Sequence, residues 1–340
     1  MAELKALQLN HTRISDAGLA HLKALKKLQW LDLTETQVSG PGLVHLKRHN
    51  HLISLKLGYT QTNDEGLSYL QDLTQLQDLT LPRTRVSDEG LVYLKGLVNL
   101  RSLGLGEAAV TDRGMKWLEG LTKLEDLDLD GTHVTEASLV HFVGMSRMEQ
   151  LSLESESVTD AGLAQLGAFK QLKALRLSGA RISDADLVHL KDLVCLEWLD
   201  LSDTPITGAG LEFLARLSHL QTFDLRGTSV NDAGLELIEK QASIQYLFLE
   251  RTQITDEGLA HLEALTNLEI LGLSGTRVTD AGLAHLKGLS SLAMLSVAGT
   301  KVTPAGAEEL KRFLPNAQIK LIDDEPQIPP EPEPPAQPPE

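Results

Sequence analysis

Four acidic residues that could bind a cation lie close together near the middle of the sequence. Asp126, Asp128 and Asp130 alternate with other residues, and Glu154 follows 24 residues after Asp130. Alternate residues of a β-strand point to the same face, so these carboxylates are expected to share one surface. Clustered carboxylates can coordinate Ca²⁺, but a flat strand does not wrap around an ion. We therefore expect either a binding surface for a basic segment of a protein partner or an ordinary solvated face.

Large apolar residues recur at a second set of positions, spaced by 24 residues or multiples of 24. This column contains Trp198, Tyr246, Ile270 and Met294, with Phe248 beside Tyr246 and Trp30 as a single counterpart near the N-terminus. If the repeats stack, the side chains form one exposed apolar patch. Exposed aromatic residues often anchor protein interfaces. The patch is therefore a predicted partner-binding surface, and the alternatives are cover by the last repeat or self-association.

Histidines recur at the same spacing, but they do not indicate a metal site. One column contains His21, His45, His141, His189, His261 and His285. The same column accepts Trp117, Phe213 and Leu237, which cannot bind a metal, so stacking along a helix is the better interpretation. The sequence has no Gly-rich phosphate loop, HExxH, CxxC or nucleophile elbow. We expect no catalysis, no cofactor, no metal and no small-molecule substrate.

Composition narrows the class of partner. The 340 residues contain 31 Lys and Arg against 47 Asp and Glu, a net charge of −16. Binding to phosphates requires clustered basic side chains, so nucleic acid is not an expected partner. Cys195 is the single cysteine, which fits a reducing compartment. No signal peptide is visible and no apolar run approaches the ~18 residues of a membrane span, so a cytoplasmic protein without membrane contact is favoured.

The elements that position these residues come from one 24-residue repeat, which recurs thirteen times from Leu4 without insertion. In the unit Leu268–Ser291, Leu271 and Leu273 alternate with polar residues, which is typical of a strand with one buried face. Thr276 follows the strand, and ten of the thirteen units have Thr at this position. Each unit is therefore expected to begin with a short strand.

The second half of each unit predicts a short helix. Thr279 is a good N-cap, and every unit has Ser, Thr or Asn at this position. Leu283, Leu286 and Leu289 are three residues apart and face one side. Gly282 is expected to lie on the inward side and to let the helix approach the strands closely.

One strand and one helix cannot bury their own leucines, so the units must stack and pair their strands in parallel. Strands need less width than helices, which predicts an α/β horseshoe solenoid with strands on the concave face and helices on the convex face. We expect one repeat domain over residues 1–322, with 304–322 acting as a C-terminal cap. Residues 323–340 are expected to form a disordered, acidic, Pro-rich tail.

The pattern LxxLxLxxT followed by [IV]-[TS]-D-x-G-L resembles the leucine-rich repeat. It is most similar to the ribonuclease-inhibitor-like and cysteine-containing subtypes, with Thr276 where those subtypes have Asn or Cys. The resemblance implies that this side chain bonds to loop backbone between repeats. Departures from the Thr and Gly columns gather in the middle of the chain, where looser or altered loops are expected. They are Ala108, Glu156 and Ala180 in the Thr column, and Ser138 and Asp186 in the Gly column.

The resemblance implies a non-catalytic scaffold that binds a protein partner on the concave face, and the partner is expected to be basic and partly apolar. The alternative is the substrate-recognition or regulatory arm of a larger enzyme complex, similar to a ubiquitin-ligase receptor or linked to a kinase, whose other domains lie outside this chain. No capping element precedes Leu4. We therefore expect a fragment of a longer protein, in preference to a first repeat that a partner covers.

Overall fold

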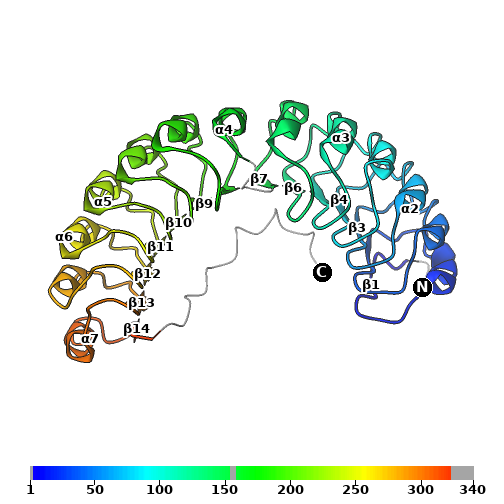
Figure 1. The fold of residues 1–340 in the computed structure, drawn as a ribbon. Helices are drawn as coiled ribbons and strands as arrows, with labels where there is room; N and C mark the ends of the chain where they lie inside the picture. Colours follow the sequence, from blue (N-terminus) through cyan, green and yellow to red (C-terminus); the bar gives the residue numbers. More distant parts are fainter. Residues whose placement is uncertain (1–2, 154–157, 323–340) are drawn as a thin grey trace. The chain divides into compact units, whose positions relative to one another are not determined.

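The computed structural model describes residues 3–153 and 158–322. The chain forms two compact units, unit 1 (Met1–Glu154) and unit 2 (Ser155–Glu340). Within each unit a strand and a short helical segment alternate along the chain, with the strands on one side of the unit and the helical segments on the other (Figure 1). The predicted strand–helix repeat is confirmed.

Within the described residues, each unit contains seven short parallel strands in chain order. Neighbouring strands pair with an offset of 24 residues, as Ala6 with Trp30 and Tyr246 with Ile270, so the sequence period is the register of the sheet. The strands of unit 1 are β1 (Ala6–Gln8), β2 (Trp30–Asp32), β3 (Ser54–Lys56), β4 (Asp78–Thr80), β5 (Ser102–Gly104), β6 (Asp126–Asp128) and β7 (Gln150–Ser152). Those of unit 2 are β8 (Ala174–Arg176), β9 (Trp198–Asp200), β10 (Thr222–Asp224), β11 (Tyr246–Phe248), β12 (Ile270–Gly272), β13 (Met294–Ser296) and β14 (Gln318–Lys320).

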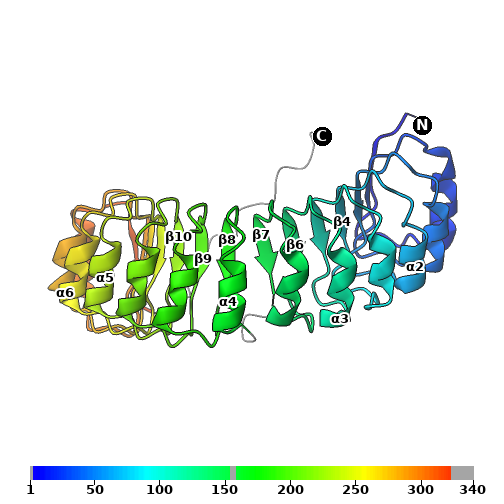
Figure 2. The same ribbon diagram turned by 90° about the horizontal axis from the view of Figure 1, so that it is seen from above.

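The helical segments form a row along one side of each sheet (Figure 2). The α-helices are α1 (Asp16–Leu19), α2 (Asp64–Ser68), α3 (Asp112–Met115), α4 (Asp160–Leu166), α5 (Asp232–Ile238), α6 (Asp256–Leu259) and α7 (Pro304–Lys311). The 3₁₀-helices are η1 (Ala20–Ala24), η2 (Pro41–His45), η3 (Gly90–Leu94), η4 (Lys116–Leu118), η5 (Glu136–Phe142), η7 (Asp184–Leu190), η8 (Gly208–Leu214), η9 (Ala260–Leu262) and η10 (Gly282–Leu286). The leucines of these segments recur every three residues, which matches the period of the 3₁₀-helix. In the part of the chain that the structure describes, no helix is long and apolar enough to cross a membrane.

The core of each unit consists of the leucine columns. Leu271 and Leu273 of β12 and the following loop are fully buried, as are Leu286 and Leu289 of the adjoining helical segment. Burying a leucine side chain contributes roughly 1.5–3 kcal/mol. The repeated rung is therefore stabilised mainly by contacts between neighbouring rungs.

The Thr column closes the loop after each strand, but by a bond within its own rung. The hydroxyl of Thr276 donates to the carbonyl of Leu273 at 2.6 Å, and that of Thr36 donates to the carbonyl of Leu33 at 2.7 Å. The prediction that the Thr hydroxyl bonds to the loop backbone between rungs is wrong, because its acceptor is the carbonyl three residues earlier in the same rung.

The loops at Ala108 and Ala180 keep the conformation of the other rungs, which contradicts the expected looser loops. The backbone nitrogen of Ala108 donates to the carbonyl of Leu105 at 3.0 Å, and Glu107 before it has φ of 55°. The residue before Ala180 is Gly179, with φ of 69°. The residue at this place has positive φ whether it is glycine or not, so the loop does not depend on the Thr hydroxyl. Glu156 lies outside the described residues.

The missing side chain at Gly282 leaves space for a carboxylate of the preceding rung, and it does not serve to bring the helix closer to a strand. A Cβ on Gly282 would lie 2.3 Å from Oδ1 of Asp256, the first residue of the helix one rung earlier. The same carboxylate accepts from the backbone nitrogen and hydroxyl of Thr279, the N-cap of the next rung. The prediction that this glycine lets the helix approach the strands is wrong, because the atom nearest to a Cβ on Gly282 belongs to Asp256.

The two residues that depart from the Gly column, Ser138 and Asp186, each form a hydrogen bond that glycine could not form. The hydroxyl of Ser138 donates to Oδ1 of Asp112, so a small polar side chain is accepted. Asp186 instead accepts from the nitrogen and hydroxyl of Ser183 at 2.7 and 2.9 Å. The Asp of the preceding rung, Asp160, accepts from Nε2 of His189 at 3.0 Å. The expectation of an altered local structure is therefore confirmed at Asp186.

Helix α7 and strand β14 lie within the range 304–322, where the sequence predicts a last helix and strand. Ile319 and Leu321 are half-buried. The action of this segment as a cap stays a prediction. The predicted tail, 323–340, lies outside the described residues.

Candidate functional site

The face of each sheet that points away from the helices is called the open face. It presents the first and third residues of each strand and the second residue after the strand. In unit 2, the register places Trp198 beside Thr222, Thr222 beside Tyr246, and Tyr246 beside Ile270. The predicted apolar column is therefore a physical row of neighbouring side chains.

Two members of the predicted exposed patch are buried. Trp198 is 5 % exposed and Phe248 is 0 % exposed. The guanidinium carbon of Arg176 lies 5.6 Å from the Trp198 ring centre, and that of Arg226 lies 5.7 Å from the Phe248 ring centre. In-register rungs about 4.8 Å apart let long side chains of one strand cover rings of the next. The expectation of exposure is wrong for these residues.

Three residues of the column remain partly exposed. Tyr246, Ile270 and Met294 are each half-buried, and they occupy the first position of three adjacent strands. We call them the apolar strip. The Tyr246 hydroxyl donates to Oε2 of Glu269 at 3.2 Å. Burial and this carboxylate raise the pKa of Tyr246, so its side chain is a neutral phenol. The hydrogen bond to Glu269 holds the ring in place.

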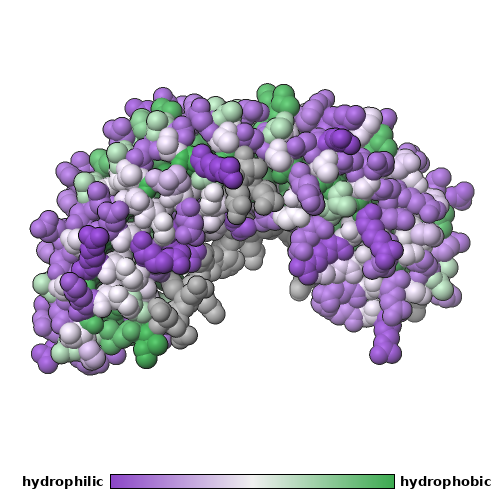
Figure 3. Space-filling model, viewed as in Figure 1, coloured by the Kyte–Doolittle hydropathy of each residue, from purple (hydrophilic) through white to green (hydrophobic). Residues whose placement is uncertain are grey.

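Figure 3 shows a mostly hydrophilic surface on the side in view, with a hydrophobic area at the end of unit 2, over β13 and β14. Met294 begins β13, so the apolar strip runs toward this part of the unit. The strip on β11, β12 and β13 and the hydrophobic area thus meet at β13.

Trp30 belongs to the open face of unit 1, between Ala6 and Ser54 in the register. It is half-buried, and its indole nitrogen is enclosed without a hydrogen-bond partner. Its neighbours are small, so it has no apolar row beside it. Trp30 stays an isolated candidate contact.

The predicted acidic cluster lies at β6 of unit 1. Asp126 accepts from the hydroxyl of Ser102 at 2.8 Å, and Asp128 accepts from the backbone nitrogen of Asp130 at 3.0 Å. All three aspartates are half-buried. Glu154, the fourth member, lies outside the described residues. The chain thus uses at least two of these carboxylates itself, and their role toward a basic segment stays a prediction.

The bond from Asp128 is one example of a recurring use of aspartate. Asp32, Asp200 and Asp224 also accept from the backbone nitrogen two residues later, at 2.9, 2.8 and 3.0 Å. An aspartate that bonds the backbone two residues on stabilises a turn. These acids therefore help to end their strands, and one carboxylate oxygen of each is already bonded to the chain.

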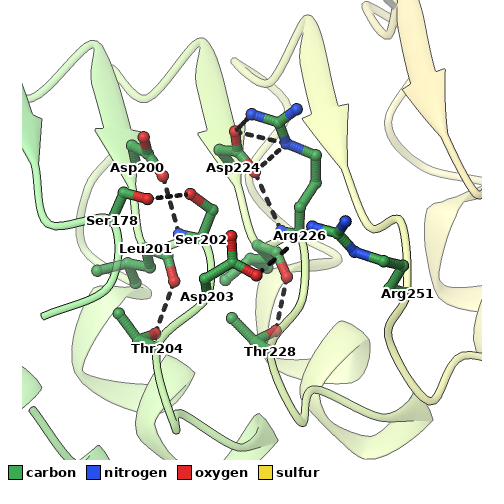
Figure 4. A network of polar contacts seen from close by, with 11 residues as sticks. Ser178, Asp200, Leu201, Ser202, Asp203, Thr204, Asp224, Arg226, Thr228 and Arg251 are labelled. Carbon is green, nitrogen blue, oxygen red and sulfur yellow. Dashed lines mark hydrogen bonds and ion pairs between the residues drawn. The ribbon is translucent and has the colours of Figure 1, made fainter. Parts of the chain in front are cut away.

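Asp224 is additionally paired with Arg226 (Figure 4). Nε of Arg226 lies 3.0 and 2.9 Å from the two carboxylate oxygens, and Nη2 lies 2.6 Å from Oδ2. Asp224 is 0 % exposed. Burial raises the pKa of Asp224 although the hydrogen bonds from Arg226 oppose this. The pair is a neutral, bidentate unit in the open face.

Glu250, two residues after β11, has no such partner. It is 7 % exposed, and neither carboxylate oxygen has a hydrogen bond. Burial raises the pKa of Glu250 from 4.5 to about 7. A Cβ on Gly272 of the next strand would lie 1.9 Å from Oε1 of Glu250, so the carboxylate occupies the place of the missing side chain. The sequence signal was a Glu in a column where the neighbouring rungs have Arg226 and Ser274.

Histidines of this column form hydrogen bonds to carboxylates of the preceding rung. Nδ1 of His141 lies 2.6 Å from Glu119, and Nδ1 of His285 lies 2.6 Å from Glu263. Within the described residues, no group of three or more His, Cys, Asp or Glu residues could hold a metal ion. The pairs favour the predicted structural role of this column.

A comparison with sequence families matched two consecutive repeats. Residues 194–215 and 216–238 match the model described as Leucine Rich repeat. A comparison with curated proteins gave no match. The family match supports the leucine-rich repeat itself, while the ribonuclease-inhibitor-like or cysteine-containing subtype stays a prediction.

Solved structures with the same fold include an internalin from Listeria monocytogenes, with a TM-score of 0.60, 18% identity, and coverage of 95% of this chain and 88% of that one. A leucine-rich-repeat protein of Leptospira interrogans matches with a TM-score of 0.68 and 18% identity, and the match covers 94% of this chain and 84% of that one. A third structure is the ectodomain of the plant receptor kinase GASSHO1/SCHENGEN3 from Arabidopsis thaliana, in complex with CASPARIAN STRIP INTEGRITY FACTOR 2. It matches with a TM-score of 0.57 and 17% identity, and the match covers 94% of this chain and 47% of that one. This chain thus spans about half of that receptor ectodomain. These likenesses show the leucine-rich-repeat fold.

Proposed function

We propose that this chain of leucine-rich repeats is a non-catalytic scaffold that binds an extended segment of a protein partner on the open face of unit 2. The apolar strip carries the proposal. Tyr246, Ile270 and Met294 are partly exposed side by side on three rungs, although other open-face positions of this unit hold Thr222 or Ala174. The repeat does not need large apolar residues there, so their cost in exposed apolar surface fits a binding role.

The chemistry around the strip indicates the kind of partner. Glu250 lies on the same rung as Tyr246 and carries no compensating hydrogen bond. A partner segment with apolar residues and a basic residue complements both features. The aspartates at β6 of unit 1 are a proposed further contact for a basic segment.

Two plant receptors with the same fold support this mode of binding. One is described in complex with CASPARIAN STRIP INTEGRITY FACTOR 2, and another is a peptide hormone receptor in complex with RGF2. Recognition of an extended segment by a row of strands allows one pocket or contact per rung. The same geometry is available to unit 2.

The test is a selection of random 16-residue peptides on the immobilised full chain, followed by affinity measurement with synthetic peptides. We expect the double variant Ile270→Ser/Met294→Ser to weaken binding by about 10-fold or more, since an interface anchor contributes above ~1 kcal/mol. Trp198→Ala and Phe248→Ala are unsuitable variants because both side chains are buried.

The matched control is Val194→Ser, which changes an apolar residue that is 44 % exposed and lies outside the strands. Its binding should equal that of the unchanged chain. Failure to enrich any peptide, or equal binding by the strip variant and the control, would contradict the proposed function. Circular dichroism of each variant confirms that the fold is retained.

A further inference from the structure

Glu250 differs from the other open-face acids that the structure describes. Asp200 and Asp224 bond to backbone nitrogens, and Asp78 accepts from Ser54, whereas the carboxylate of Glu250 is enclosed with no hydrogen bond. An ionised group taken out of water without a partner is unfavourable. The chain therefore keeps a carboxylate in a position where the cost of burial exceeds the stabilisation that its neighbours provide.

The nearest cationic groups are already engaged elsewhere. Arg226 occupies the same column one rung earlier, but its guanidinium binds Asp224 in a bidentate manner. Arg251 follows Glu250 directly, and its Nη2 reaches Asp203 at 3.4 Å. Figure 4 shows both arginines turned to these aspartates, and neither donates a hydrogen bond to Glu250, although both lower its pKa as nearby positive charges.

The strands on the other side of Glu250 offer no compensating charge. On β12 its neighbour is Gly272, whose missing side chain leaves the space that the carboxylate fills. The hydroxyls of Ser274 and Ser296 bond to each other at 2.8 Å. Ser178, Ser202 and Ser274 occupy the equivalent position of three other rungs, so the repeat does not need Glu here.

We propose that the carboxylate of Glu250 anchors one arginine or lysine side chain of the bound partner segment. This inference rests on the proposed function and specifies the chemistry of one contact in it. Rotation of Glu250 about its side-chain bonds carries the carboxylate out of the space beside Gly272 and toward a partner on the open face. Tyr246 begins the apolar strip four residues earlier, about 13 Å along the strand. A matching segment has a basic residue about four extended residues from an apolar one.

The protonation of Glu250 supplies a signature of this contact. Its pKa is raised to about 7 by burial. The charged groups that face it are Arg226 and Asp224 from β10 and Arg251 from its own loop, while β12 and β13 present Gly272, Ser274 and Ser296. A cation at Glu250 favours the ionised form, so binding should release a proton near neutral pH.

The first experiment is a double-mutant cycle with a selected peptide that contains arginine. Replacing this arginine by citrulline, which keeps the shape and removes the charge, should weaken binding to the unchanged chain on the order of 30-fold. The same replacement should cost less than about threefold on Glu250→Gln. An equal loss on both proteins would overturn the anchor and leave the proposed function standing.

The second experiment needs no selected peptide. N-acetyl-arginine amide is titrated into the full chain while the ¹³C signal of the Glu250 carboxyl, assigned by its loss in Glu250→Gln, is followed against pH. At ten times its Kd the probe should lower the apparent pKa of Glu250 by about 1. N-acetyl-citrulline amide should leave the pKa unchanged. Equal effects of the two probes, or no effect of either, would overturn the anchor.

Discussion

Asp256 of one rung holds the helix start of the next rung through Thr279. Its Oδ1 accepts from the backbone nitrogen of Thr279 at 2.7 Å, and its Oδ2 accepts from the Thr279 hydroxyl at 2.6 Å. Equivalent pairs are Asp16–Ser39, Asp64–Ser87, Asp88–Thr111, Asp112–Thr135, Asp184–Thr207, Asp232–Thr255 and Asp280–Thr303.

The rungs that contain Gly40 and Gly208 share a different solution, in which two residues change together. Gly40 and Gly208 stand where the Asp would be, and the N-caps that follow are Asn63 and Asn231. A Cβ on Gly40 would lie 1.8 Å from Oδ1 of Asn63. The larger Asn side chain therefore fills the space that the Asp carboxylate occupies elsewhere, and it caps its own helix by accepting from the nitrogen of Gly66 at 3.1 Å.

This relationship predicts a rescue. Asp256→Gly should destabilise the chain by about 2 kcal/mol, because two hydrogen bonds to a charged group are lost. Adding Thr279→Asn should recover about half of the loss by reproducing the Gly40–Asn63 pair. Urea unfolding measures both values. Thr279→Asn alone is the control. It should destabilise the chain, since the Asp256 carboxylate then competes with the introduced amide for the same space. A double variant that is no more stable than Asp256→Gly would contradict this relationship.

The positive backbone angle at Gly275 predicts a cost for any side chain. Its φ is 72°, so Gly275→Ala should destabilise by about 1–2 kcal/mol, the cost of the left-handed conformation. Gly288→Ala is the control, because a Cβ there meets nothing within 4 Å. It should be neutral within about 0.5 kcal/mol. Thermal unfolding of the two variants decides the matter, and equal midpoints would refute the role of the angle.

Glu250 predicts a pH dependence of stability. Its pKa is about 7 in the folded chain against 4.5 ordinarily, so between these values the folded chain binds more protons than the unfolded chain. Stability therefore falls as pH rises through this window. Above pH 7 the penalty reaches up to about 3 kcal/mol. Glu250→Gln should raise the urea midpoint at pH 8 and change it little at pH 4.

The exposed Glu212 supplies the control for this experiment. Glu212→Gln should not alter the difference in urea midpoint between pH 4 and pH 8. If Glu250→Gln gives the same profile as Glu212→Gln, the buried carboxylate is not the source of the pH dependence.

The Asp224–Arg226 pair predicts a large loss when it is broken from one side. Arg226→Ala leaves Asp224, which is 0 % exposed, without its bidentate partner and should cost about 3 kcal/mol at pH 8. The additional change Asp224→Asn removes the charge and should restore part of this loss. Lowering the pH should narrow the gap because Asp224 becomes protonated. Equal unfolding midpoints for the single and double variants at pH 8 would be inconsistent with a buried unpaired charge.

The repeat architecture was predictable because one period controls every level of the structure. The offset of 24 residues between Tyr246 and Ile270 in the sequence is also their pairing in the sheet. Columns of like residues in the sequence are rows of neighbours in space, so the open face could be assigned residue by residue.

Exposure and pairing on that face could not be predicted in the same way. Trp198 is buried partly because Arg176 reaches across from the neighbouring strand, and the direction of a long side chain is not visible in a periodic pattern. The sequence predicts Asp126, Asp128 and Asp130 as a charged surface, whereas Asp128 already bonds the backbone of its own chain. Glu250 is distinguished by what its neighbours do not offer, which only the arrangement of Arg226 and Gly272 reveals.

The bond from Asp256 to Thr279 spans the boundary between two rungs, and the Gly40–Asn63 exchange does the same. A repeat copied or deleted from strand start to strand start would separate such partners and could place Asn after Asp. The segment that can be moved intact runs from one helix start to the next N-cap. The natural module of this chain for duplication or for engineering is therefore offset by half a rung from the leucine pattern that first defines it.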